Sequence, residues 1–170
     1  MSNNIRLLLA EPEDSKEIYD VMMAGYESHE DKTLFVPDEY ENIVKYLRSD
    51  GFFIKAVNES GRIVGFFMVK YPGTDEDNLG RDIGLSEKEQ MKVAHMESVA
   101  ILPEARGLGL QTKMMLEAEQ HIDGEYKYLM ATVSPYNPAS YISTEKAGYE
   151  NVLTKEKYGG KLRRIYLKKR

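Results

Sequence analysis

A glycine-containing turn in the stretch Ile101–Met115, ILPEARGLGLQTKMM, joins a strand-like run to a helix-like run. Gly107 and Gly109 open the helix, although glycine in a helix costs roughly 1 kcal/mol relative to alanine. A helix N-terminus offers unpaired N–H groups and a partial positive charge. These groups can bind a phosphate where no side chain blocks them, and Arg106 adds a cation beside them. A tight turn that needs permissive dihedral angles explains the same glycines, so both interpretations stay open at this stage.

Hydrophobic periodicity and turn residues predict an α/β domain around one sheet. The expected elements are a strand at 5–10, helices at 12–26 and 37–49, a hairpin at 51–72, a strand at 90–102, a helix at 110–122, a strand at 126–137, a short helix at 138–149 and a hairpin at 149–170. In the strand at 90–102, simple alternation places His95, Glu97, Val99 and Ile101 on one face. Residues 73–88 are polar and glycine-rich, and they form either a mobile loop or part of a site.

Length, composition and charge restrict the number of domains and the kinds of partner to be expected. The length of 170 residues suits a single domain over 1–170. No apolar run approaches the roughly 20 residues of a membrane span, and MSNNIRLLLAEPED lacks the features of a secretory signal, so we expect no membrane partner and a cytoplasmic location. The net charge of −5 argues against a nucleic-acid partner. The chain has no cysteine and its histidines, His29, His95 and His121, are scattered, so we expect no metal.

Two phosphate-binding motifs do not fit the turn. A Walker A loop ends in Gly-Lys-Ser/Thr, whereas Gly109 is followed by Leu110 and Gln111. A dinucleotide fingerprint needs a third glycine where Thr112 stands. Basic residues dominate Lys155–Arg170, which indicates either a solvated edge strand or a landing area for an anionic ligand.

Taken together, the motifs resemble those of the GNAT superfamily of acyl-CoA-dependent N-acyltransferases. The family motif R/Q-x-x-G-x-G/A follows a hydrophobic strand and a proline, and VAILPEARGLGLQ supplies matching residues at Val99, Ile101, Pro103, Arg106 and Gly109. Gln111 departs from the final small position. A second signature, an asparagine followed eleven residues later by Gly-Phe, is matched by Asn137, Gly148 and Tyr149.

The resemblance implies a single mixed, mostly antiparallel sheet of about six to seven strands flanked by about four helices. It also implies that the central strands at 93–102 and 128–135 splay apart. Acetyl-CoA, the expected co-substrate, would place its pantetheine arm against the backbone of Val99 and Ile101. Its diphosphate would lie on the N–H groups of the turn, with Asn137 nearby. The expected turn residues are Arg106, Gly107, Leu108, Gly109, Leu110 and Gln111.

The resemblance further implies a base that removes a proton from the attacking amine, and Glu97 or His95 is suitably placed. The alternatives are a carboxylate paired with a neighbouring cation for Glu97 and a hydrogen-bonded structural imidazole for His95. The family commonly protonates the leaving thiolate with a tyrosine seven residues after the asparagine, but here that residue is Thr144. Tyr141, one helical turn earlier, carries the right group, or it packs its ring in the core.

The implied reaction is transfer of an acetyl or related acyl group from acetyl-CoA to a primary amine by direct attack in a ternary complex. The amine belongs to a small molecule or to a protein or peptide, and a homodimer is one assembly open to the chain. The segments TDEDN and SHEDK either offer carboxylates to a cationic amine or are solvated loops. The alternative function is a catalytically impaired acyl-CoA-binding sensor or regulatory module.

Overall fold

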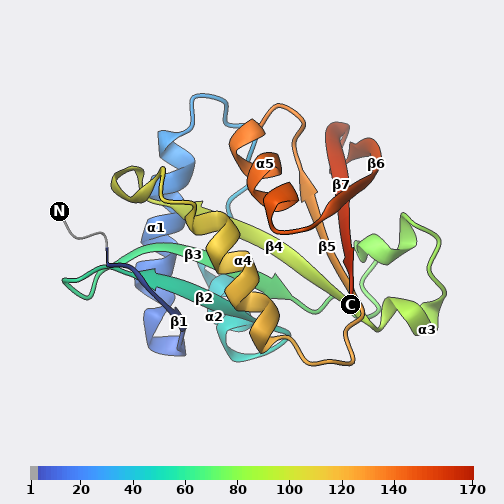
Figure 1. Cartoon of the computed structure of the whole chain (residues 1–170), viewed down its shortest axis with the longest axis horizontal. Coiled ribbons are helices and arrows are strands. Elements are labelled where there is room, and N and C mark those ends of the chain that lie inside the picture. Colours follow the sequence, from blue (N-terminus) through green and yellow to red (C-terminus); the bar gives the residue numbers. More distant parts are fainter. Residues whose placement is uncertain (1–3) are drawn as a thin grey trace.

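A seven-stranded mixed sheet forms the centre of the molecule, with strand order β1-β2-β3-β4-β5-β7-β6 (Figure 1). The computed structural model describes residues 4–170, so the first three residues of the N-terminal stretch lie outside the described residues. All neighbouring strands are antiparallel except β4 and β5. The strands are β1 (Arg6–Leu9), β2 (Gly51–Val57), β3 (Ile63–Lys70), β4 (Val93–Ile101), β5 (Tyr128–Val133), β6 (Glu150–Lys157) and β7 (Lys161–Lys169). This architecture confirms the predicted fold class.

Helices cover both faces of the sheet. They are α1 (Ser15–Ser28), α2 (Tyr40–Arg48), α3 (Glu87–Gln90), α4 (Leu110–His121) and α5 (Pro138–Lys146), with 3-10 turns η1 (Pro12–Asp14), η2 (Leu79–Arg81) and η3 (Pro103–Ala105). Figure 1 shows α4 in front of the sheet and α1 and α2 behind it. Helix α1 packs closely on β4, since a Cβ at Gly25 would lie 3.2 Å from that of Ala100. None of the described helices is long and apolar enough to cross a membrane.

Residues 73–88 form an ordered insertion that contains η2 and the start of α3. The buried side chain of Asn78 organises it: its amide donates to Gly73 O (2.8 Å) and Gln90 O (3.0 Å), and its oxygen accepts from Gly80 N–H (2.8 Å). Leu79 then packs in a small apolar cluster with residues of β4, β5 and β7. The segment therefore has internal structure of its own, and through Asp77 it contributes to the main cavity, as in the second of the two alternatives given for it.

The basic side chains of the last hairpin largely have partners within the fold. Asp82, in the insertion, accepts from Lys155 (2.8 Å) and Lys157 (2.7 Å). On the other face of β7, Lys168 pairs with Glu119 at 2.7 Å. These pairs hold the hairpin to the insertion and to α4, so these three lysines have a structural role.

Replacing Asp82 by Asn should loosen the hairpin. Burial alone would raise the pKa of Asp82, but the two lysines outweigh it and lower the pKa below the ordinary 3.8. A carboxylate with a lowered folded-state pKa stabilises the fold above its unfolded pKa, and this contribution is lost as the pH falls through the folded-state value. We expect the variant to lose about 1–3 kcal/mol of unfolding free energy at neutral pH. The deficit should shrink in acid below pH 3.8. Urea titrations at both pH values test this, and equal stabilities at neutral pH would contradict it.

Candidate active site

The parallel strands β4 and β5 pair over only three positions, from Val93 and Tyr128 to His95 and Met130, and then separate. This confirms the predicted splay. Leu102 N–H donates to Val64 O on the β3 side (2.8 Å). Because backbone groups of alternate residues point to the same neighbouring strand, Ala100 also faces β3, whereas Val99 and Ile101 direct theirs into the gap. The gap therefore presents backbone groups of Val99 and Ile101 that no neighbouring strand pairs.

A β-bulge at Glu97 changes the face of the sheet to which the preceding side chains of β4 point. Met68 on β3 lies opposite Ser98, and the next residue, Val69, lies opposite Met96, so Glu97 is the extra residue. Consecutive residues on β3 point to opposite faces, so Met96 and Ser98 do too. The expectation that His95 shares a face with Val99 and Ile101 was therefore wrong: His95 lies on the face of Ser98, Ala100 and α1.

The turn before α4 leaves its amides open. Gly107 and Gly109 have φ values of 81° and 70°, and a Cβ on either would meet no atom within 4 Å. Backbone geometry alone thus requires glycine here. The first hydrogen bond of α4 runs from Lys113 N–H to Gly109 O (3.1 Å). In the part of the chain that the structure describes, no hydrogen bond uses the N–H groups of residues 107–111, so they are available to a ligand.

Side chains around the turn fasten it to its neighbours. The Arg106 guanidinium donates to Ile101 O (3.2 Å) and Ser28 Oγ (2.6 Å). The backbone N–H of Arg106 donates to Pro103 O (3.3 Å). Gln111 directs its amide to Ser140 Oγ on α5 (3.0 Å), so its bulk lies away from the open amides. Asn137 caps α5 by accepting from Ser140 N–H (3.4 Å).

One cavity of about 670 Å³ connects the turn with the gap. Of the residues predicted to bind coenzyme, all but Leu108 line it: Val99, Ile101, Arg106, Gly107, Gly109, Leu110, Gln111 and Asn137. Other polar residues that line the same cavity include Asp38, Asp77, Glu97, Thr132, Tyr158 and Arg163. Asp77 comes from the TDEDN segment, and His29 is the SHEDK residue that lines the cavity. Asp38, Tyr158 and Arg163 carried no sequence signal, because they reach the cavity only through tertiary packing.

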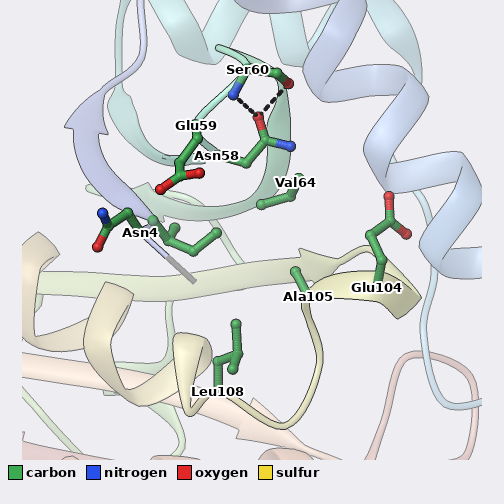
Figure 2. A pocket seen from close by; sticks show the side chains of 9 residues that line it. Asn4, Asn58, Glu59, Ser60, Val64, Glu104, Ala105 and Leu108 are labelled. Carbon is green, nitrogen blue, oxygen red and sulfur yellow. Dashed lines mark hydrogen bonds between the residues drawn. The ribbon is translucent and has the colours of Figure 1, made fainter. Parts of the chain in front are cut away.

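A smaller hollow of about 340 Å³ lies beside the β2–β3 turn and η3 (Figure 2). Leu108 lines it, together with Glu59 and Glu104. Asn58 Oδ1 is held within its own turn by Ser60 N–H (3.1 Å) and Ser60 Oγ (2.8 Å). The carboxylates of Glu59 and Glu104 in this smaller hollow would repel a phosphate, so the larger cavity is the better candidate for the active site.

Glu97 and His95 lie side by side at the narrow end of the gap. The imidazole is buried, with its Nε2 accepting from Leu79 N–H (3.0 Å). Because an amide can only donate, the ring proton lies on Nδ1, 3.2 Å from Glu97 Oε2. Both ring nitrogens are thus engaged, as in the hydrogen-bonded alternative for His95. The Glu97 side chain retains 34% exposure into the cavity.

Charged neighbours surround Glu97. Burial, reinforced by the nearby charge of Glu97, raises the pKa of Asp38. Burial alone would lower the pKa of Lys70, but Glu97 and Asp77 outweigh it and raise the value. Lys70 also pairs with Asp77 at 3.3 Å. This side of the cavity is therefore suited to a cationic group.

The structure distinguishes the tyrosines near α5. Thr144, at the family's tyrosine position, is buried and donates to Ser140 O (2.9 Å). Tyr141 is not among the described residues that line the cavity, and its ring packs under Arg164, 4.2 Å from the guanidinium carbon. Tyr158, with a left-handed φ of 50°, does line the cavity, and its hydroxyl lies 3.3 Å from Thr132 Oγ1. Although Tyr158 as a whole is 53% exposed, partial desolvation on the cavity side and the carboxylates of Glu97 and Asp77 raise its pKa, against the opposing effects of Thr132 and Arg163.

Comparison with solved structures identifies proteins of similar fold. The alanine acetyltransferase of ribosomal protein S5 from Vibrio fischeri has a TM-score of 0.71 at 14% identity, covering 99% of this chain and 94% of that one. An N-acetyltransferase from Staphylococcus aureus scores 0.68 at 17% identity and 98% coverage of both chains. Aminoglycoside acetyltransferase AAC(6')-Ib, solved with coenzyme A and kanamycin, scores 0.68 at 16% identity, covering 98% and 95%.

Sequence comparison gives the family directly. No curated protein sequence matches the chain significantly. The family model for GNAT acetyltransferases, however, matches residues 15–149, which run from the start of α1 to the end of the second signature. The chain belongs to the GNAT acetyltransferase family.

Proposed function

We propose that the protein is an N-acetyltransferase that transfers an acetyl group from acetyl-CoA to a primary amine within a ternary complex. The observation that carries the proposal is the connected cavity, in which open amides, an unpaired strand edge and an exposed carboxylate follow one another. Two proteins of similar fold acetylate aminoglycosides and a ribosomal-protein alanine, so both small-molecule and protein amines are candidate acceptors.

The chain's own groups fit coenzyme A. The open N–H groups from Gly107 to Gln111 match the diphosphate, since a helix N-terminus favours negative charge. The backbone of Val99 and Ile101 pairs with the amide groups of the pantetheine arm as an added strand would. Acetyl-CoA supplies the acetyl group as a thioester, and Val99 N–H stabilises negative charge that develops on its carbonyl oxygen.

Glu97 acts as the general base. Its exposed carboxylate takes a proton from the amine, directly or through one water, as nitrogen attacks the carbonyl carbon. His95 is a positioning residue, because Leu79 N–H fixes the ring and its Nδ1 lies 3.2 Å from Glu97 Oε2. This arrangement needs no proton transfer by the imidazole.

Tyr158 is the better candidate for the proton donor to the leaving thiolate. Thr132 lies two residues beyond the last β4–β5 pair, so the phenol next to it stands where the gap has opened. A raised pKa keeps that phenol protonated at neutral pH. As the C–S bond breaks, its O–H proton passes to sulfur, and solvent returns a proton to the phenolate.

Replacing Tyr158 by Phe should lower kcat by about 100-fold, the lower end of the range expected for loss of general acid catalysis. The dissociation constant for coenzyme A should stay unchanged. Tyr141→Phe is the matched control, because that ring packs outside the cavity and should retain wild-type kcat. Steady-state kinetics and calorimetry test both variants. If Tyr141→Phe is the slower enzyme, the assignment is wrong.

Thiol release from acetyl-CoA in the presence of pooled amines, followed by mass spectrometry of the products, tests the whole proposal. Acetylated amine and free thiol in equal amounts support it. A second candidate, an acyl-CoA-binding sensor, is favoured by Thr144 at the family's tyrosine position. Saturable binding of acetyl-CoA without thiol release for any amine would select that function instead.

A further inference from the structure

Two adjacent arginines on β7 have opposite surroundings. Arg164 donates to Tyr166 Oη (3.4 Å), lies 3.8 Å from Glu145 and covers the Tyr141 ring. Arg163 is only 8% exposed, yet its guanidinium donates just to two backbone carbonyls, Leu162 O (2.8 Å) and Thr33 O (3.3 Å). Among the described residues no carboxylate lies within ion-pair distance of Arg163.

A buried cation without a counter-ion is expensive, since desolvation is not repaid by neutral carbonyls alone. A guanidinium has more N–H donors than these two carbonyls accept, and its planar fork matches a carboxylate in two-pronged fashion. Arg163 lines the main cavity, so the missing anion can be supplied from there.

The position of Arg163 assigns it to the acceptor rather than to the coenzyme. The contact with Thr33 places the guanidinium between β7 and the loop that joins α1 to α2. Ile165, two residues along β7 and therefore on the same face, packs with Leu79 of the insertion, on the side of His95 and Glu97. The diphosphate amides belong to α4, which covers the opposite face of the sheet (Figure 1).

The main cavity also carries acidic groups, and these lie apart from Arg163. Asp38 and Glu97 are close enough to raise the pKa of Asp38. The lysine beside them, Lys70, interacts with Glu97, Asp77 and Asp38 together, so among the described residues carboxylates outnumber cations there. An ammonium group is attracted to Asp38 and Glu97, whereas an anionic group is repelled there and attracted by Arg163. The main cavity thus has a negatively charged region at Asp38 and Glu97 and a positively charged one at Arg163.

We propose that the acceptor is a small dipolar amine, in which the amine to be acetylated and a carboxylate belong to one molecule, as in a free amino acid. The ammonium enters at Asp38 and Glu97, and the carboxylate binds Arg163. This inference rests on the proposed function, because it identifies the substrate of that site. It favours amino acids over polyamines and aminoglycosides, which carry no anionic group.

Matched pairs of acceptors test the inference in the wild-type protein. Lysine and cadaverine, and ornithine and putrescine, differ only by the α-carboxylate. We expect the carboxylate-bearing member of a pair to have at least a 10-fold higher kcat/KM, and to bind at least 10-fold more tightly by calorimetry in the presence of coenzyme A. Comparison of phosphoethanolamine with ethanolamine shows whether a phosphate can replace the carboxylate. If phosphoethanolamine is preferred over ethanolamine but neither amino acid is preferred over its diamine, the carboxylate assignment is wrong. Equal values within every pair would overturn the proposal.

Variants identify the group responsible. Arg163→Met should remove the preference within each pair, Arg163→Lys should retain part of it, and Arg164→Met, the neighbouring control, should leave it intact. Thermal unfolding shows whether Arg163→Met folds, and the wild-type pairs decide the question if it does not. A weakened affinity for coenzyme A in Arg163→Lys would assign the cation to the coenzyme and overturn the proposal. Calorimetry needs no turnover, so an absence of acetylation with preserved dipolar binding would refute only the proposed function.

Discussion

Replacing Glu97 by Gln should lower kcat by about 100-fold or more, the effect expected when a general base is removed. The side chain keeps its size and its place beside His95. The dissociation constant for coenzyme A should not change, because the open amides and the β4 edge that would bind it lie elsewhere in the cavity. Without a base, only the deprotonated amine can attack. The residual rate should therefore rise tenfold per pH unit up to the pKa of the amine.

Glu59→Gln is the matched control for this experiment, since Glu59 lines the smaller hollow rather than the active-site cavity. That variant should have the kcat and pH profile of the wild type. Steady-state rates across a pH series, with coenzyme binding measured by calorimetry, distinguish the cases. A Glu97→Gln enzyme as fast as the wild type would show that Glu97 is not the base.

Replacing Gly109 by Trp should raise the dissociation constant for coenzyme A by at least about 100-fold. A Cβ at Gly109 points into open space next to the free N–H groups, so the indole would occupy the volume proposed for the diphosphate. Loss of two hydrogen bonds to a charged ligand, at about 1.5–3 kcal/mol each, suffices for this effect. The N-terminal field of α4 would remain, but the phosphate could no longer approach it.

Gly61→Trp controls for the backbone strain of the substitution. Gly61 has a φ of 84° and likewise has no atom within 4 Å of a built Cβ, but it lies in the β2–β3 turn. Both tryptophans should lower the melting temperature to a similar extent, because a left-handed conformation costs an L-residue about 1–2 kcal/mol. Only Gly109→Trp should weaken coenzyme binding. Equal, unchanged affinities would show that the turn does not bind the diphosphate.

The order of the elements and the glycine turn could be predicted because their signals are local. Apolar spacing in α1 and the turn residues at 58–61 and 159–160 act within a few positions of each other. The splay between β4 and β5 followed only from the resemblance, since nothing within either strand specifies where their pairing stops.

The acceptor side of the cavity could not be predicted, because it depends on contacts between distant segments. The bulge at Glu97 exists only relative to the register of β3, and simple alternation therefore gave the wrong facing for His95. Tyr158 and Arg163 resemble other residues of a basic hairpin until Thr132 and Thr33 are placed beside them. Tyr141 was a natural candidate by helical spacing, but Arg164 covers its ring.

The extra residue in β4 makes the strand serve two molecules with one chain. On its N-terminal side, the side chains of His95 and Glu97 lie at the end of the cavity proposed for the acceptor. On its C-terminal side, the backbone of Val99 and Ile101 faces the gap. A change of side chain in one half of β4 leaves the other half undisturbed. Gain or loss of a single residue between the halves would instead turn the side chains of one half to the opposite face of the sheet. Under the proposed function, substitutions at β4 positions other than Glu97 leave this division intact, whereas an insertion or deletion between Glu97 and Val99 would abolish it.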